Sequence, residues 1–196
     1  FDMGPSWYWM PDVFEKYFKD FGKDINDYIK LKRLDPSYKV FFGDEVIDIP
    51  ADYNSLKDLL DSMEEGSGDK LDEFLAQAEK KYKVGIENLV YKPGLSLSEF
   101  IDKDTISGIF KLDVFKSMFN HIRKYFQNEK IIKLLEFPVL FLGATPKNTP
   151  ALYSLMNYAD IKLGTWYPEG GMFKVVDAMI ELAKEKGVKF YNGQDV

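Results

Sequence analysis

The spacing of apolar residues changes along the chain, and this change limits the folds that the chain can adopt. Between Tyr28 and Ile49 apolar and polar residues alternate, which is typical of strands with one buried face. Over residues 54–160 apolar residues recur every three or four positions, as they do on amphipathic helices. We therefore predict an α+β fold, in which a small mixed, largely antiparallel sheet carries a helical lobe.

Turn signals divide the alternating region into three short strands. Asp35-Pro36-Ser37 and Gly43-Asp44-Glu45 consist of residues that favour tight turns, so we expect an antiparallel meander. A short helix that opens at Pro11 precedes it. After the helical region, residues 172–186 have the spacing of an amphipathic helix, and we expect a further strand over residues 188–191.

In this interpretation residues 1–53 and 161–196 form the sheet portion, and residues 54–160 form the helical lobe. The chain begins with Phe1 rather than Met, so we expect it to be a piece of a longer protein. No N-terminal signal peptide is visible. The longest apolar stretch, residues 137–144, is far shorter than the roughly 20 residues that span a bilayer.

The composition excludes several classes of protein. Hydrophobic residues make up 45% of the chain and charged residues 30%, which indicates a globular rather than a disordered chain. The formal net charge is −6 and no run of Lys or Arg stands out, so we expect no nucleic acid partner. The chain has no Cys and a single His, His121. Disulfides, thiol nucleophiles, Cys-ligated metals and two-histidine zinc sites are thereby excluded, and we expect no metal.

Phe, Tyr and Trp together make up 16% of the residues. This content indicates a large aromatic core, an apolar ligand site, or both. The chain contains no GxGxxG fingerprint, P-loop, GxSxG elbow or HExxH motif. Composition and general motifs therefore leave the function open.

Three stretches of sequence are more specific, and they resemble the phytoene desaturase branch of the FAD-dependent, amine-oxidase-like flavoproteins. They are FDMGPSWYWMP at 1–11, RLDPSY at 33–38, and a third that runs from FLG at 141–143 through TPALYSLMNYAD at 149–160 to GTWYPEGGM at 164–172. Their order and spacing follow the family along most of the chain, and residues 51–110 match it only loosely.

The resemblance implies an activity and a cofactor. Members of this family transfer a hydride from an allylic carbon of a long polyene to FAD, and a proton leaves beside it. We therefore expect the substrate-binding part of an FAD-dependent carotenoid desaturase that acts on a precursor such as phytoene. Members carry a Rossmann-type FAD motif that this sequence lacks. We expect this chain to be the middle segment without the FAD-binding domain, inactive and free of FAD on its own.

The resemblance also implies a location. A carotenoid precursor dissolves only in lipid, so we expect a cytoplasmic protein that is peripherally associated with a membrane. Residues 54–135 are the candidate membrane-facing lobe. Many acidic residues in that lobe would be repelled by anionic lipid, so we expect contact through apolar tips such as Ile106–Leu112.

The resemblance places candidate site residues on three parts of the chain. The turn that brings backbone close to the flavin is expected at Gly170, Gly171 and Met172. The residues expected to bind the substrate are Gly4, Pro5, Ser6, Trp7, Tyr153, Asn157, Trp166 and Tyr167. Of these, Tyr153 and Asn157 are candidates because their spacing, together with that of Asp160, predicts one shared helical face. His121 and Arg123 lie within an apolar stripe from Phe115 to Phe126 that predicts a helix. No catalytic base is identified, and the candidates are His121, Arg123 and Asp160. Each of these has a structural alternative: an ordinary turn, core packing, a hydrogen-bond network or a solvated helix face.

Two other functions stay open. Related flavoproteins isomerise carotenes or oxidise terminal methyl groups, and these motifs do not separate them from desaturases. From another class, a non-enzymatic domain that binds apolar ligands or membranes would show the same aromatic content.

Overall fold

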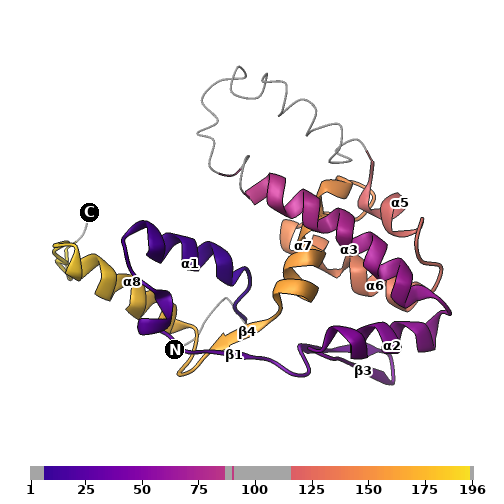
Figure 1. Cartoon of the computed structure of the whole chain (residues 1–196), viewed down its shortest axis with the longest axis horizontal. Coiled ribbons are helices and arrows are strands. Elements are labelled where there is room, and N and C mark those ends of the chain that lie inside the picture. Colours follow the sequence, from indigo (N-terminus) through magenta and orange to yellow (C-terminus); the bar gives the residue numbers. More distant parts are fainter. Residues whose placement is uncertain (1–6, 87–89, 91–115, 195–196) are drawn as a thin grey trace, which may run out of the picture. The chain divides into compact units, whose positions relative to one another are not determined.

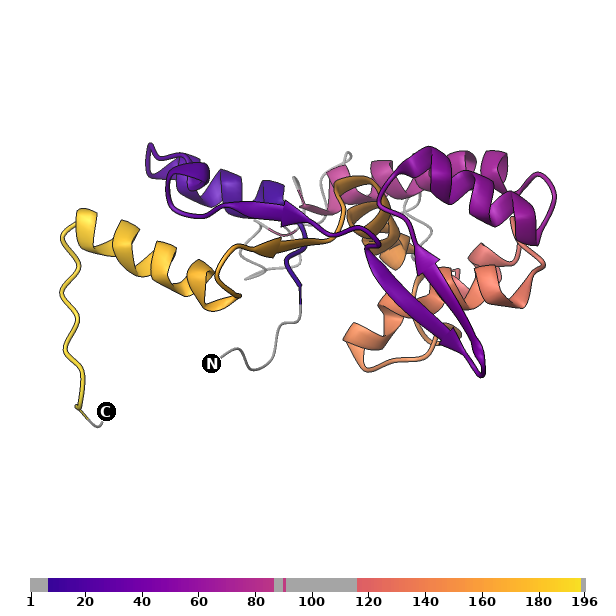
Figure 2. The same cartoon turned by 90° about the horizontal axis from the view of Figure 1, so that it is seen from below.

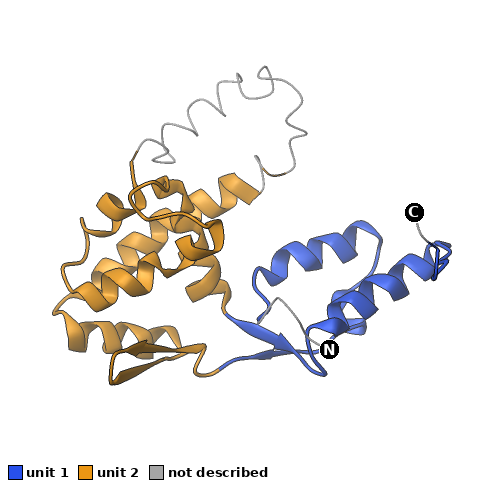
Figure 3. Cartoon of the chain, turned by 180° about the vertical axis from the view of Figure 1, so that it is seen from behind, with its two compact units in different colours: residues 1–34, 165–196 blue, residues 35–164 orange. Residues whose placement is uncertain are grey.

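The computed structural model describes residues 7–86, 90 and 116–194. The chain divides into two compact units, which Figure 3 shows in different colours. Unit 1 comprises residues 1–34 and 165–196, and unit 2 is the continuous stretch 35–164. Most of the described secondary structure is helical, and the strands pair into small antiparallel sheets. The predicted α+β fold class is confirmed.

Unit 1 is built from helices and strands contributed by both ends of the chain (Figure 1). In chain order they are α1 (Pro11–Asp20), the 3₁₀ turn η1 (Ile25–Asp27), β1 (Leu31–Arg33), β4 (Trp166–Pro168) and α8 (Phe173–Glu185). β1 and β4 pair in antiparallel fashion, with Leu31 opposite Pro168 and Arg33 opposite Trp166. Their core consists of buried residues from each part, namely Tyr8, Phe18, Ile25, Ile29, Ala178 and Leu182.

Helix α8 ends where the sequence predicts, and the strand predicted after it is wrong. Gly187 has a φ of 86°, a conformation that suits a residue without a side chain just past a helix. The amide of Val188 then donates to the carbonyl of Ala183 at 3.0 Å. This bond ends the helix, and residues 188–194 continue as an exposed segment without strand pairing in the described structure. Alternating apolar residues form a strand only where a partner strand lies beside them.

Unit 2 begins with a hairpin and continues with helices. Strands β2 (Tyr38–Phe42) and β3 (Glu45–Ile49) pair around the two-residue turn Gly43–Asp44 (Figure 2). Gly43 has a φ of 63°, which this tight turn requires. Ile47 and Ile49 are buried on the inner face, whereas Phe41 and Val46 point outward and are exposed.

The predicted three-stranded meander is therefore wrong. β1 belongs to unit 1 and pairs with β4, whereas β2 pairs only with β3 among the described strands. The backbone explains the division, because the amide of Leu34 donates to the carbonyl of Thr165 and the amide of Ser37 donates to that of Ile49. The turn signal at Asp35-Pro36-Ser37 marks the crossing from one unit to the other rather than a hairpin.

The helices of unit 2 pack around α3. They are α2 (Tyr53–Met63), α3 (Ser67–Val84), α5 (Met118–Ile122), α6 (Glu129–Glu136), the 3₁₀ helices η4 (Phe137–Leu142) and η5 (Ala151–Ser154), α7 (Leu155–Tyr158) and the π-helical η6 (Ala159–Leu163). Local capping fixes several starts: Asp52 accepts from the amide of Ser55 at 2.8 Å, and Asn128 accepts from that of Lys130 at 2.9 Å.

The core of unit 2 follows the apolar stripes of the sequence. Phe74 and Leu75 of α3 are fully buried against residues of α5 and α6, including Ile122 and Leu135. The stripe predicted from Phe115 to Phe126 yields only the short α5. Ser96 and Glu99 have the spacing of a capping box and predict a helix over 96–101. This segment and the tip Ile106–Leu112 lie outside the described residues.

We predict that Leu135→Ala lowers the free energy of unfolding by about 2–5 kcal/mol, because it leaves a cavity in a close-packed core. The matched control is Leu140→Ala on η4, because Leu135 is 0% exposed and Leu140 is 69% exposed. The control should change stability by less than about 0.5 kcal/mol. Urea unfolding followed by circular dichroism measures both, and equal losses would contradict this placement of the core.

Candidate functional site

Strand β4 brings together the predicted site residues of unit 1. The amide of Tyr8 donates to the carbonyl of Trp166 at 2.8 Å, and the amide of Trp166 donates back at 3.0 Å. The segment around Tyr8 therefore lies along one edge of β4, while β1 lies along the other. Trp7, Trp166 and Tyr167 share this ribbon. The predicted residues Gly4, Pro5 and Ser6 lie outside the described residues.

The ribbon has two faces with different surroundings. Tyr8 and Trp166 pack into the core of unit 1, and the guanidinium of Arg33 lies 5.3 Å from the centre of the Trp166 ring. The Trp166 ring therefore packs against the core of unit 1 and also contacts the Arg33 guanidinium. Since neighbouring residues on a strand point to opposite faces, Trp7, Trp9, Thr165 and Tyr167 lie on the other face.

We call these four residues the tryptophan face. Its members are held in place: the indole nitrogen Nε1 of Trp9 donates to Oγ1 of Thr165 at 3.1 Å, and the rings of Trp7 and Trp9 are 5.8 Å apart. Trp7, Trp9 and Tyr167 are half-buried. Flat rings fixed in this way form an apolar surface that fits a long hydrocarbon without a polar handle.

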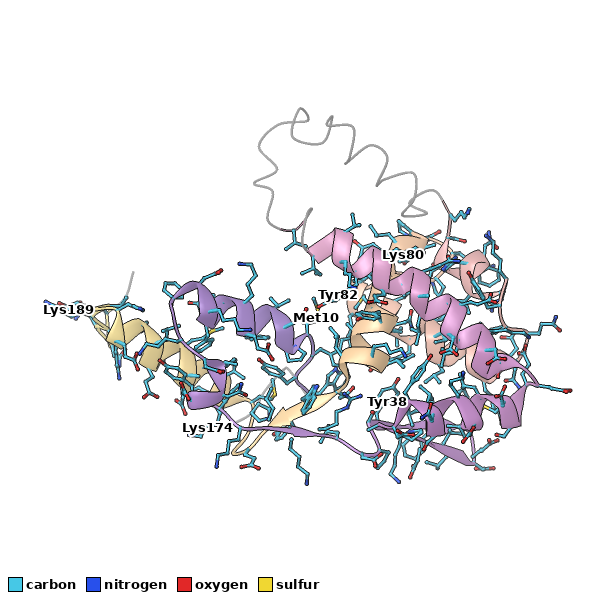
Figure 4. The ribbon with its side chains drawn as sticks, in the orientation of Figure 1. Met10, Tyr38, Lys80, Tyr82, Lys174 and Lys189 are labelled. Atoms are coloured by element: carbon cyan, nitrogen blue, oxygen red, sulfur yellow. The ribbon has the colours of Figure 1, made fainter. Side chains whose placement is uncertain are left out.

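The Gly170–Gly171 turn joins the end of β4 to α8. Both glycines have positive φ, 90° and 99°, which residues with a side chain rarely adopt. A Cβ added at Gly170 would lie 3.2 Å from Cε of Lys174, a side chain labelled in Figure 4. Gly170 is exposed, and Gly171 and Met172 are half-buried. The exposed Lys174 side chain therefore lies beside Gly170, and a planar group at this turn would meet that side chain as well as the backbone.

The predicted polar residues of unit 2 lie on consecutive short helices but have different partners. Tyr38 of β2 donates its hydroxyl to Oδ2 of buried Asp160 at 2.7 Å, and Tyr38 is labelled in Figure 4. Asn157 donates Nδ2 to the carbonyl of Leu135 at 3.0 Å, and Tyr153 is half-buried on η5. Burial, and then the Asp160 carboxylate, raise the pKa of Tyr38 well above its ordinary value. The phenol therefore stays protonated and ties the hairpin to η6.

His121 is buried rather than solvated, and it belongs to a polar cluster that sequence reasoning missed. Its Nε2 lies 3.2 Å from Nζ of Lys81 on α3. The same Nζ donates to the carbonyl of Ala151 at 3.1 Å and to Oγ of Ser154 at 3.2 Å. The sequence does indicate this cluster. Lys81 lies three residues after buried Ala78 on the apolar stripe of α3, and this spacing predicts that Lys81 is buried too.

Arg123 lies nearby in the sequence but has other partners. Its Nη1 donates to Oε1 of Glu136 at 2.5 Å, and its guanidinium carbon is 3.6 Å from the centre of the Phe119 ring. These contacts join the end of α5 to the end of α6. His121 and Arg123 lie on one predicted stripe, but in the structure they contact different partners.

An open groove of about 540 Å³ in unit 2 is lined by apolar and acidic residues together. Its lining includes the carboxylates of Asp35, Asp48 and Asp58, and none of the predicted site residues is among the residues around it. Within residues 7–86, 90 and 116–194, no group of three or more His, Cys, Asp or Glu side chains could hold a metal ion. In the same part of the chain, no helix is long and apolar enough to cross a membrane.

The buried Tyr38–Asp160 contact can be tested. We predict that Tyr38→Phe lowers the free energy of unfolding by about 1–3 kcal/mol at pH 7, because it removes the donor from a buried carboxylate. The folded chain holds the phenol proton above the ordinary pKa, whereas the unfolded chain releases it near pH 10. The free energy of unfolding of the unaltered chain should therefore fall as the pH rises above about 10. In Tyr38→Phe this free energy should fall less over the same pH range, because the contribution of Tyr38 is absent.

Urea unfolding measures both effects, at pH 7 and then in steps up to about pH 11. The last step lies about one pH unit above the ordinary tyrosine pKa. The control is Tyr53→Phe, whose hydroxyl donates at 2.6 Å to Asp72, an exposed carboxylate that also pairs with Lys57. We expect the control to cost less than Tyr38→Phe at pH 7. An equal cost for the two variants would show that burial of Asp160 is irrelevant.

Comparisons with known proteins cover the chain from end to end. It is 38% identical over its whole length to a carotenoid 3,4-desaturase of Haloarcula japonica, and covers 40% of that protein. It is 31% identical over its whole length to a zeta-carotene-forming phytoene desaturase of Myxococcus xanthus, and covers 38% of it. Over 96% of the chain it is 34% identical to a 4,4′-diapophytoene desaturase of Staphylococcus aureus, again covering 38%.

No protein-family model matches the chain. The chain spans about two fifths of the length of the curated relatives that it matches. The three relatives differ in the substrates that their names give, yet all three names are those of desaturases in carotenoid chemistry. These alignments extend over nearly the whole chain and confirm the resemblance seen in the sequence motifs. The chain belongs to the carotenoid and phytoene desaturase family.

Proposed function

We propose that this chain is the substrate-binding part of an FAD-dependent carotenoid desaturase that introduces conjugated double bonds into a long polyene such as phytoene. The observation that carries the proposal is end-to-end similarity to three desaturases of carotenoid substrates. The tryptophan face supports it, because this face offers the fixed apolar surface that a hydrocarbon substrate needs.

The residues around the glycine turn fit a flavin. Gly170 and Gly171 have positive φ and no Cβ, so a ring system can lie close to their backbone once the exposed Lys174 side chain beside Gly170 moves aside. Gly170, Gly171 and Met172 are the residues that would hold the ring. When bound, FAD supplies the acceptor for the hydride. The FAD-binding sequence itself is proposed to lie outside this chain, since the dinucleotide fingerprint is absent from it.

The chain's own contribution is alignment and exclusion of water. A polyene has no polar group to orient it, so its position depends on the shape of an apolar surface. Trp7 and Tyr167 on the tryptophan face would hold the substrate beside the glycine turn at the end of the same strand. Tyr153 and Asn157 remain proposed lining residues. Trp166, also proposed for the lining, would instead support the tryptophan face from behind, because its ring packs in the core of unit 1.

Three residues remain candidates for accepting or steering the proton that leaves the substrate. His121 lies against Lys81, Asp160 accepts from Tyr38 and Arg123 pairs with Glu136. Each already has a partner that keeps it in place, which favours positioning roles. We also propose a cytoplasmic protein with peripheral membrane contact, because the substrate is soluble in lipid.

The activity is tested in the full-length protein that carries this chain, expressed in a host that accumulates phytoene. We predict red or yellow conjugated products, and their loss when Gly170 and Gly171 are both replaced by Val, because the side chains would block close approach to the flavin. Chromatography with absorption spectra identifies the pigments. FAD content is measured in the same samples by fluorescence.

The matched control is Gly187→Val, which strains a glycine of similar positive φ (86° against 90° and 99°) at the other end of α8. It should reduce pigment far less than the double variant. Colourless phytoene from folded, FAD-loaded unaltered protein would contradict phytoene as the substrate. Equal loss in both variants would contradict a flavin contact at the glycine turn.

A second prediction concerns the chain alone. The 196 residues, purified in the presence of excess FAD and then desalted, should retain no flavin. Flavin absorbance of the desalted chain measures retention. Stoichiometric FAD in the desalted chain would show that the nucleotide cradle lies within it.

A further inference from the structure

Three consecutive large hydrophobic residues are exposed on η4. Leu140, Phe141 and Leu142 are 69%, 49% and 39% exposed, whereas Val139 just before them is 1% exposed. We call Leu140, Phe141 and Leu142 the η4 tip. Scattered exposed apolar residues are common on soluble proteins, but a run of this kind marks a contact surface more often than chance placement.

The η4 tip projects from a base that is held at both ends. Before it, Glu136 is bound by Arg123 at 2.5 Å. After it, the carbonyl of Pro146 accepts from the amide of Phe119 at 3.0 Å. Both anchors lie on or beside α5, so the tip is presented by a fixed turn rather than by a loose loop.

Two cations lie at this base. The Phe119 ring has the Arg123 guanidinium 3.6 Å from its centre and the Lys147 ammonium 5.1 Å from it. Residues 116–149 contain six Lys or Arg and two Glu, a formal charge of +4 with His121 neutral, in a chain of net charge −6. Lys124, Lys133 and Lys147 are exposed. The acidic residues are concentrated elsewhere, for example on α2 and α3.

We infer that the η4 tip and the basic residues of 116–149 dock the protein on an anionic phospholipid surface. Apolar side chains that enter the headgroup region, flanked by Lys and Arg that stay in it, are the two features of interfacial binding. The exposed Lys124, Lys133 and Lys147 favour lipid over another part of a longer protein as the occupant, because Lys is depleted from contacts between protein surfaces. The inference rests on the proposed function only for the substrate's solubility in lipid.

This surface differs from the tip Ile106–Leu112 that the sequence suggested, and it is part of the described structure. It also explains how an acidic protein could approach an acidic membrane. The charge that matters is local, since interactions in salt solution decay within about 8–10 Å.

The test is vesicle flotation of the full-length protein, with vesicles of phosphatidylcholine alone or with about 30% phosphatidylglycerol as the anionic component. We expect binding to the anionic vesicles, weakened by salt. Leu140→Ser with Leu142→Ser should reduce the partition coefficient about tenfold or more. This variant keeps Phe141, whose ring packs against Phe137 at 5.3 Å. Lys124→Gln with Lys133→Gln should reduce it about fivefold or more on anionic vesicles only.

The matched control is Phe41→Ser with Val46→Ser on the β2–β3 hairpin. These residues are 70% and 48% exposed and face each other across the strands, so the change removes a comparable exposed apolar pair that is not part of the η4 tip. It keeps Glu45, the partner of Lys130. The control should bind as the unaltered protein does. Urea unfolding of every variant establishes that it is folded.

A reporter makes the inference falsifiable even if a variant folds poorly. Phe141→Trp should shift its emission to shorter wavelength on addition of anionic vesicles, and brominated lipid should quench it. Emission that is already shifted and shielded from acrylamide without vesicles would mean that protein covers the η4 tip, and would overturn the inference. Binding unaffected by the Leu140 and Leu142 changes would overturn it too. Neither readout depends on pigment formation, so failure of the proposed activity is seen separately.

Discussion

The pairing of β4 with β1 on one edge and with Tyr8 on the other is the contact on which the architecture depends. It joins residues from the two ends of the chain, closes the core of unit 1 and fixes which side chains of 165–168 face away from that core. An isolated two-stranded ribbon is marginally stable in water, so the helices packed on it matter as much as the pairing itself. Phe18 of α1 and Leu182 of α8 are both buried against it. The tryptophan face and the glycine turn occupy their positions because this ribbon is held from one side.

Much of the helical structure could be predicted because its signals are local. The stripe over Leu71, Phe74, Leu75, Ala78 and Tyr82 predicts α3, and the glycines near 66 and 187 mark helix ends. Strand partners could not be predicted in the same way. Alternation tells which face of β1 is buried but not which strand lies beside it, and the partner comes from the far end of the chain. The turn residues at 35–37 favoured a hairpin, whereas long-range hydrogen bonds at Leu34 and Ser37 decided the topology.

The candidate site was predictable to a different degree in each unit. In unit 1 the residues suggested by resemblance lie on one ribbon and the turn that follows it. In unit 2 the periodicity placed Asn157 and Asp160 on one helical face, but the segment passes from 3₁₀ to α to π geometry. A change of helix type rotates successive side chains differently from a uniform helix, so these residues reach different partners. Lys81 shows the reverse case, because its buried position follows from the α3 stripe and only its polar character concealed it.

The amide of Leu34 and the carbonyl of Thr165, joined at 3.0 Å, have a consequence for how such proteins diversify. They mark the two points where the chain leaves unit 1 and returns to it, and unit 2 is everything between. A segment whose ends meet in this way is topologically an insertion, and its length and contents can change with little strain on the strands that flank it. Evolution can thus remodel residues 35–164 by substitution, lengthening or exchange while the register of β1 and β4 persists. Recombination at these two points would be a natural way to build chimaeras between relatives named for different substrates.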